Sequence, residues 1–216
     1  MNPSTPLLQV QGLVKRYRHG WVNPQTTFEL QADFAIEGPA IVGVMGANGA
    51  GKTTLFELIT GGNRPSAGCV RVAGQDIHAV RPRERDRLAL HYHQSYQLRS
   101  FHAGKPAFLL ERARSERPLV HLFDEPQFST QDGYIGFMLE FFRRLRAQGR
   151  LVFLCLHPNE PVHLAILAEV CERFVFVQKD TARVSRLSFA PTLPALAQEP
   201  AVGTYLGRLM AHLPAA

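Results

Sequence analysis

The order of apolar and polar residues along the chain predicts a series of short strands. Residues 7–11 and 28–34 alternate between apolar and polar side chains, which is typical of strands with one exposed face. Residues 40–45, 119–123 and 151–156 are almost continuously apolar, which indicates strands buried on both faces. We expect strands at residues 7–11, 28–34, 40–45, 69–72, 88–93, 119–123, 151–156 and 174–177.

Helical periodicity separates most of these strands. We expect helices at residues 53–60, 105–114, 134–147, 162–171 and 202–213. Strands that alternate with helices favour an α/β fold with a mostly parallel sheet flanked by helices, and the early alternating strands favour a small antiparallel β layer beside it. We expect one domain over residues 1–187 and a C-terminal tail with a short helix over residues 188–216.

The composition is typical of a globular protein that is long enough to bury a core. Of the 216 residues, 45% are hydrophobic and 19% are charged, and no apolar run reaches the roughly 18 residues that a membrane span needs. The first residues lack the basic and apolar segments of a secretion signal, and the three cysteines are widely spaced. We therefore expect a cytoplasmic protein with unpaired thiols.

Arginine clusters contribute to a formal net charge of +6. They are Arg81, Arg83, Arg85 and Arg87, then Arg112, Arg114 and Arg117, and then Arg143, Arg144 and Arg146. The simplest interpretation is solvated helix faces, and an anionic membrane surface is an alternative. Nucleic acid is an unlikely partner because no aromatic residues interleave the clusters in a stacking pattern.

A glycine-rich loop after the apolar strand 40–45 is the strongest functional motif. Residues 46–53 read Gly-Ala-Asn-Gly-Ala-Gly-Lys-Thr, which fits the phosphate-binding P-loop pattern between a strand and a helix. Backbone N–H groups and the helix N-terminus would face the phosphates, Lys52 would reach the β- and γ-phosphates, and Thr53 would hold Mg²⁺. The expected nucleotide-binding residues here are Gly46, Asn48, Gly49, Ala50, Gly51, Lys52, Thr53 and Thr54.

A pair of carboxylates follows the apolar strand 119–123. Asp124 comes directly after this strand and is a candidate for the Mg²⁺ shell, and Glu125 is a candidate general base toward a water. The Asn/Thr-Lys-x-Asp motif that reads guanine is absent from the sequence, which favours ATP over GTP.

Together these motifs resemble the ATPase subunit of ABC transporters, over residues 7–187. The resemblance implies that Tyr17 stacks on adenine, that Gln94 senses Mg²⁺ and the attacking water, and that His157 contacts the γ-phosphate. It thus implies a catalytic set of Lys52, Glu125 and His157, a metal set of Thr53, Gln94 and Asp124, and ATP with Mg²⁺ as cofactors.

The chain departs from that family between Gln94 and Asp124. The family places a helical subdomain and a Leu-Ser-Gly-Gly-Gln signature loop here, but residues 95–123 number only 29. The helical subdomain is therefore predicted to be largely missing, and the signature falls on Ser100-Phe101-His102-Ala103-Gly104. Because this loop lacks the central glycines, a hetero-oligomer is a better expectation than a productive homodimer.

Two functions remain open, and a third, a nucleic-acid-associated ABC-like ATPase, is a weaker alternative that only the arginine clusters suggest. The first is an ATP-binding and ATP-hydrolysing subunit of an ABC-type membrane complex, peripheral on the inner face of the cell membrane, with a membrane subunit or a second ATPase subunit as partner. The second is a regulatory module in which ATP binding switches a protein contact. His91 and His93 lie on one face of a predicted strand, but no third metal ligand is evident, so we expect structural histidines.

Overall fold

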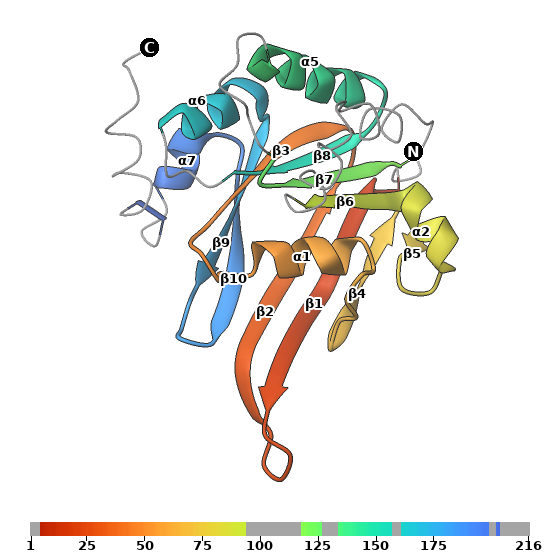
Figure 1. Ribbon diagram of the computed structural model, residues 1–216, viewed down its shortest axis with the longest axis vertical. Helices are drawn as coiled ribbons and strands as arrows, with labels where there is room; N and C mark the ends of the chain where they lie inside the picture. Colours follow the sequence, from red (N-terminus) through yellow and green to blue (C-terminus); the bar gives the residue numbers. More distant parts are fainter. Residues whose placement is uncertain (1–4, 94–117, 127–133, 157–160, 199–201, 204–216) are drawn as a thin grey trace.

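A single mixed sheet carries the fold in the computed structural model, which describes residues 5–93, 118–126, 134–156, 161–198 and 202–203 (Figure 1). The strands in these residues are β1 (Leu8–His19), β2 (Gln25–Ile36), β3 (Ala40–Met45), β4 (Ala67–Val72), β5 (Gln75–Asp76), β6 (Ala89–His93), β7 (Val120–Asp124), β8 (Leu151–Cys155), β9 (Arg173–Lys179) and β10 (Val184–Ala190). The helices are α1 (Lys52–Ile59), α2 (Pro82–Leu88), α5 (Tyr134–Ala147), α6 (Pro161–Val170) and α7 (Leu193–Ala197).

The strand order is β5-β4-β1-β2-β10-β9-β3-β8-β7-β6. Strands β9, β3, β8, β7 and β6 pair in parallel, whereas β5, β4, β1 and β2 pair antiparallel. A short parallel contact between β2 and β10 joins the two parts, since only Val184 and Ser185 of β10 are in register with β2. The predicted α/β fold is confirmed, with the antiparallel layer continuous with the parallel strands.

Two apolar cores lie on the two faces of the parallel strands. On one face, α1 packs between these strands and the antiparallel layer through Leu55, Phe56, Leu58 and Ile59, which are fully buried. On the other face, α5, α6 and α7 cover the sheet, and Phe142 and Leu164 belong to that core. The packing of α1 therefore fixes the position of the loop that precedes it, at the carboxyl end of β3.

Several elements differ from the sequence-based expectation. Strands β1 and β2 each have 12 residues and form a long hairpin, because a bulge near Gly12, which has a φ of 52°, lets the pairing continue past the polar positions. Leu88 ends α2 instead of beginning a strand. Strand β10 was not predicted and carries residues 188–190 of the expected tail, so the boundary at residue 187 stays a prediction.

The expected helix at residues 105–114 and most of the one at 202–213 lie outside the described residues. Among the residues that are described, no helix is long and apolar enough to cross a membrane.

Candidate nucleotide-binding site

The carboxyl ends of three parallel strands meet at one edge of the sheet, and the predicted site residues follow them. Strand β8 lies between β3 and β7, with Cys155 in register with Val44 on one side and with Asp124 on the other. The loop after β3 and the carboxylates at the end of β7 are therefore neighbours, although some 70 residues separate them in sequence. Such an edge is where open α/β sheets usually bind ligands.

The loop between β3 and α1 needs glycine for its shape. Gly46, Gly49 and Gly51 have φ values of 147°, 69° and 106°, a region that other residues rarely adopt. A Cβ atom at Gly46 would lie 2.1 Å from the carbonyl oxygen of Val177, and one at Gly51 would lie 2.8 Å from the ring of Phe28. No described side chain caps the N-terminus of α1, so its first N–H groups stay available to an anion.

Lys52 and Thr53, the first residues of α1, point toward the loop and toward β7. The Lys52 Nζ donates to the carbonyl oxygens of Gly46, at 2.8 Å, and Ala47, at 3.1 Å. The Thr53 hydroxyl donates to Asp124 Oδ2 at 2.8 Å. A nearly buried ammonium that donates to these two carbonyl oxygens would bind a phosphate more strongly than it binds such neutral acceptors.

Asp124 is buried at the end of β7 and stays negatively charged. Burial by itself would raise its pKa, but hydrogen bonds from His91 and Thr53 outweigh burial and lower the pKa below its usual value. The Nε2 atom of His91 lies 3.3 Å from Asp124 Oδ2. A hydroxyl and a charged carboxylate are oxygen ligands of the kind that Mg²⁺ prefers, so the residues present fit this ion.

His91 is a neighbour of the site that the sequence did not assign to it. The sequence indicates only that His91 and His93 share one face of a strand, and the position of His91 beside Asp124 depends on the pairing of β6 with β7. In the described part of the chain, no group of three His, Cys, Asp or Glu residues is placed to hold a metal.

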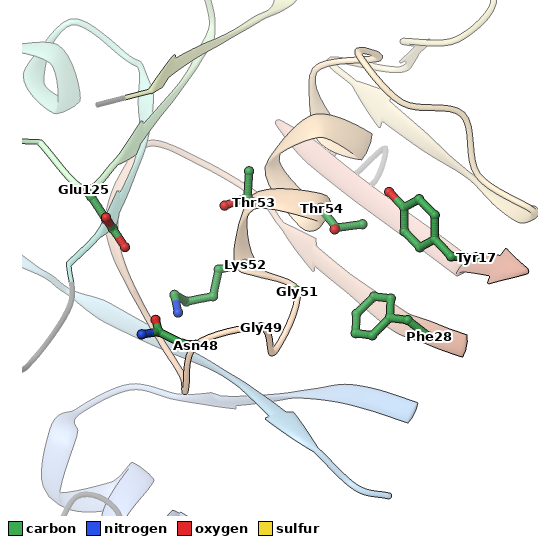
Figure 2. Close-up of a pocket in the computed structure, with 9 residues that line it drawn as sticks. All are labelled: Tyr17, Phe28, Asn48, Gly49, Gly51, Lys52, Thr53, Thr54 and Glu125. Atoms are coloured by element: carbon green, nitrogen blue, oxygen red, sulfur yellow. The ribbon is translucent and has the colours of Figure 1, made fainter. Parts of the chain in front are cut away.

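Glu125 lines a cavity of about 380 Å³ next to the glycine loop (Figure 2). Its backbone adopts a left-handed conformation with a φ of 52°, and its N–H donates to the Cys155 carbonyl at 2.9 Å. A conformation of this kind is uncommon outside glycine and is often found at functional sites. The cavity is lined by Tyr17, Phe28, Asn48, Gly49, Gly51, Lys52, Thr53, Thr54 and Glu125.

Two aromatic rings from the β1–β2 hairpin lie at the other side of this cavity (Figure 2). Tyr17 and Phe28 are partners in the strand register, and their ring centres are 6.1 Å apart. The Tyr17 hydroxyl accepts a hydrogen bond from Asn63 Nδ2 at 2.7 Å, and the Lys15 Nζ lies 5.0 Å from the Tyr17 ring centre. Sequence reasoning missed Phe28, because only the register of the hairpin places it beside Tyr17.

Most of the predicted site residues thus come together around one cavity. Gly46 and Ala50 belong to the loop but do not line the cavity. Asp124 does not line the cavity either, but it accepts a hydrogen bond from Thr53, which does. Gln94, His157 and the segment Ser100 to Gly104 lie outside the described residues, so their expected roles stay predictions.

Sequence comparisons agree with this geometry. The sequence profile of the ABC transporter family matches residues 30–105, which include the whole glycine loop. The Nod factor export ATP-binding protein I of Ralstonia nicotianae is 30% identical over 199 residues, which cover 71% of this chain and 60% of that protein. The chain is therefore similar to the ABC transporter family. Its resemblance to ABC ATPase subunits, first suggested by short motifs, is confirmed.

Other relatives match over shorter stretches. The ribose import ATP-binding protein RbsA of Pseudomonas putida is 31% identical over 134 residues, which cover 56% of this chain and 25% of that protein. The lipoprotein-releasing system ATP-binding protein LolD of Alcanivorax borkumensis is 34% identical over 92 residues, which cover 43% of this chain and 40% of that protein. The chain therefore spans only part of the length of these curated relatives.

Solved structures show the same fold. A nucleotide-free ATP-binding cassette from an ABC transporter has a TM-score of 0.66 at 15% identity, covering 93% of this chain and 98% of that one. An ATP-binding subunit of an ABC transporter has a TM-score of 0.61 at 19% identity, covering 94% of this chain and 99% of that one.

Proposed function

We propose that this chain binds ATP with Mg²⁺ and hydrolyses it as the ATPase subunit of a membrane complex. The observation that supports this proposal best is the cavity that Lys52, Thr53 and Glu125 line together. Asp124 accepts a hydrogen bond from Thr53 beside this cavity. A phosphate-binding cation, a set of oxygen ligands and a candidate base within one cavity are the groups that ATP hydrolysis requires.

Two of the proposed phosphate contacts come from groups that the structure describes. Lys52 exchanges its two carbonyl acceptors for oxygens of the β- and γ-phosphates, and the N-terminus of α1 adds N–H donors. Thr53 and Asp124 would hold Mg²⁺, which would offset the negative charge that develops on the phosphates during transfer. As in the family that the chain resembles, Gln94 is expected to join the metal shell.

Glu125 is the proposed general base. Its side chain faces the same cavity as Lys52, so it can accept a proton from a water that attacks the γ-phosphate. The resemblance to ABC ATPases gives His157 the role of a γ-phosphate contact. On the opposite side of the cavity, Tyr17 stacks on adenine, and Phe28 extends this apolar surface.

The proposed partners are a membrane subunit, a second ATPase subunit, or both. The relatives in the comparisons include import and export ATP-binding proteins, which supports a place on the inner face of the cell membrane. The short segment between Gln94 and Asp124, with its reduced signature loop, supports a hetero-oligomer over a homodimer.

Two substitutions test the proposal. Lys52→Ala should abolish or severely weaken ATP binding in calorimetry, whereas Glu125→Gln should keep ATP binding and lose phosphate release. Glu140→Gln is the matched control for the second variant, because it makes the same chemical change on an exposed position of α5. Unchanged ATP affinity in Lys52→Ala, or unchanged turnover in Glu125→Gln, would overturn the assignment.

A second function is favoured by the same short segment. Without most of the helical subdomain, ATP binding itself could switch a protein contact with little turnover. Steady-state phosphate release across a concentration series, with and without candidate partners, separates the two functions. Turnover that a partner raises supports the membrane-complex subunit, and a flat low rate with every partner supports the switch.

A further inference from the structure

The tip of the β1–β2 hairpin presents two large apolar side chains to solvent. The hairpin extends away from the rest of the molecule, at the end opposite to α5 (Figure 1). Its pairing continues to His19 and Gln25, so the tip consists of residues 20–24. Trp21 and Val22 are fully exposed in this tip, with 105% and 99% of their reference areas accessible. Tryptophan is usually one of the more buried residue types, so an exposed Trp next to an exposed Val is unusual.

The charged side chains within the tip and the strand ends beside it, residues 15–28, are all basic. Residues 1–28 contain no Asp or Glu. Farther down the hairpin, Arg16 pairs with Glu29 at 2.6 Å and Lys15 donates to Asn63, so these two cations already have partners. Arg18 is exposed near the tip and has no ion-pair partner among the residues that the structure describes. The exposed side chains of Trp21 and Val22 therefore lie in the hairpin next to the exposed, positively charged Arg18.

We propose that this tip docks on an anionic lipid membrane, with Trp21 and Val22 inserted at the level of the headgroups. The Trp indole combines a large apolar face with an N–H donor, which suits the boundary between headgroups and acyl chains. Arg18 adds attraction to anionic lipids, as basic residues beside apolar anchors do in interfacial segments. A convex tip with two anchors gives weak binding by itself and orients a complex that other contacts also hold. The proposal does not depend on ATP binding.

Trp21 is the single tryptophan of the chain, so its fluorescence reports on this site alone. The experiment adds the whole protein to phosphatidylcholine vesicles with or without phosphatidylglycerol and records Trp emission and cosedimentation. With anionic vesicles, we expect a blue shift and quenching by brominated acyl chains. With neutral vesicles, we expect a much smaller change, since the attraction between Arg18 and the surface is then absent.

Three variants sharpen the test. Arg18→Gln should weaken binding to anionic vesicles at least about fivefold, and Trp21→Ala should weaken cosedimentation at least about tenfold. Arg144→Gln is the matched control for Arg18→Gln, because it removes an exposed arginine from α5 at the other end of the molecule. It should leave the emission shift unchanged.

Three results would overturn the proposal. The first is cosedimentation with anionic vesicles while Trp21 emission stays unchanged, which would show that another basic surface binds the lipid. The second is no binding to any vesicle. The third is an emission shift that requires an added protein and no lipid, which would identify the tip as a protein contact.

Discussion

Acid should destabilise this protein through one buried histidine. His121 lies in β7 with no exposed surface, and its ring is nearly parallel to the rings of Tyr92 and Phe123 in a stack. Its Nδ1 atom lies 3.0 Å from the Tyr92 hydroxyl. Burial, and then the positive charge of Arg150, lower the pKa of His121 to about 3, and the nearby Pro118 backbone only partly opposes this shift.

The sign and the size of the effect follow from that pKa. The unfolded chain binds a proton at this histidine near pH 6.5, whereas the folded protein excludes it until the pH falls to about 3. The free energy of unfolding therefore falls as the pH drops through this window, by up to about 1.4 kcal/mol per pH unit. Between about pH 7 and pH 4 the loss from His121 alone should be about 3 kcal/mol, a large share of a typical domain's stability.

The assay is urea unfolding of the wild type and of His121→Phe, followed by circular dichroism over this pH range. The variant keeps a flat ring in the stack and loses the titrating group, so the difference between the two proteins should change by about 3 kcal/mol. Tyr92→Phe is the matched control: it removes the same hydrogen bond but keeps the titrating histidine, so its free energy of unfolding should still fall between about pH 7 and pH 4. If His121→Phe runs parallel to the wild type at every pH, the histidine already accepts a proton in the folded state and the reasoning fails.

Three further predictions concern the nucleotide site. Gly46→Ala should abolish ATP binding in calorimetry, because its methyl group would overlap the Val177 carbonyl, whereas Gly49→Ala has room and should lose less; equal effects would contradict this account of the loop. Asp124→Asn should reduce the gain in ATP affinity on adding Mg²⁺ at least about tenfold and leave metal-free binding intact, and an unchanged Mg²⁺ titration would exclude Asp124 from the metal shell. Phe28→Ala should weaken ATP binding about fivefold without changing the affinity for inorganic triphosphate, because ring stacking contributes about 1 kcal/mol; an equal loss for both ligands would argue against a base contact.

The local parts of the site could be predicted from the sequence because their geometry depends on consecutive residues. An apolar strand, a glycine-rich turn and a helix place Lys52 and Thr53 at the helix N-terminus whatever surrounds them. The apolar run before Asp124 likewise indicated a buried strand that ends in a carboxylate. The alternation of strands and helices was sufficient for the α/β class, since few architectures bury such a pattern.

The contacts between distant segments were decided only by the tertiary structure. Phe28 joins Tyr17 through the hairpin register, and His91 reaches Asp124 through the pairing of β6 with β7. Strand β10 alternates polar and apolar residues too weakly to predict, yet β9 and β2 supply its backbone hydrogen bonds. The burial of His121, with its lowered pKa, depends in the same way on the helices and strands that pack around β7. Such pairings depend on which strands become neighbours, and the free energy that selects those neighbours comes from burying the whole core.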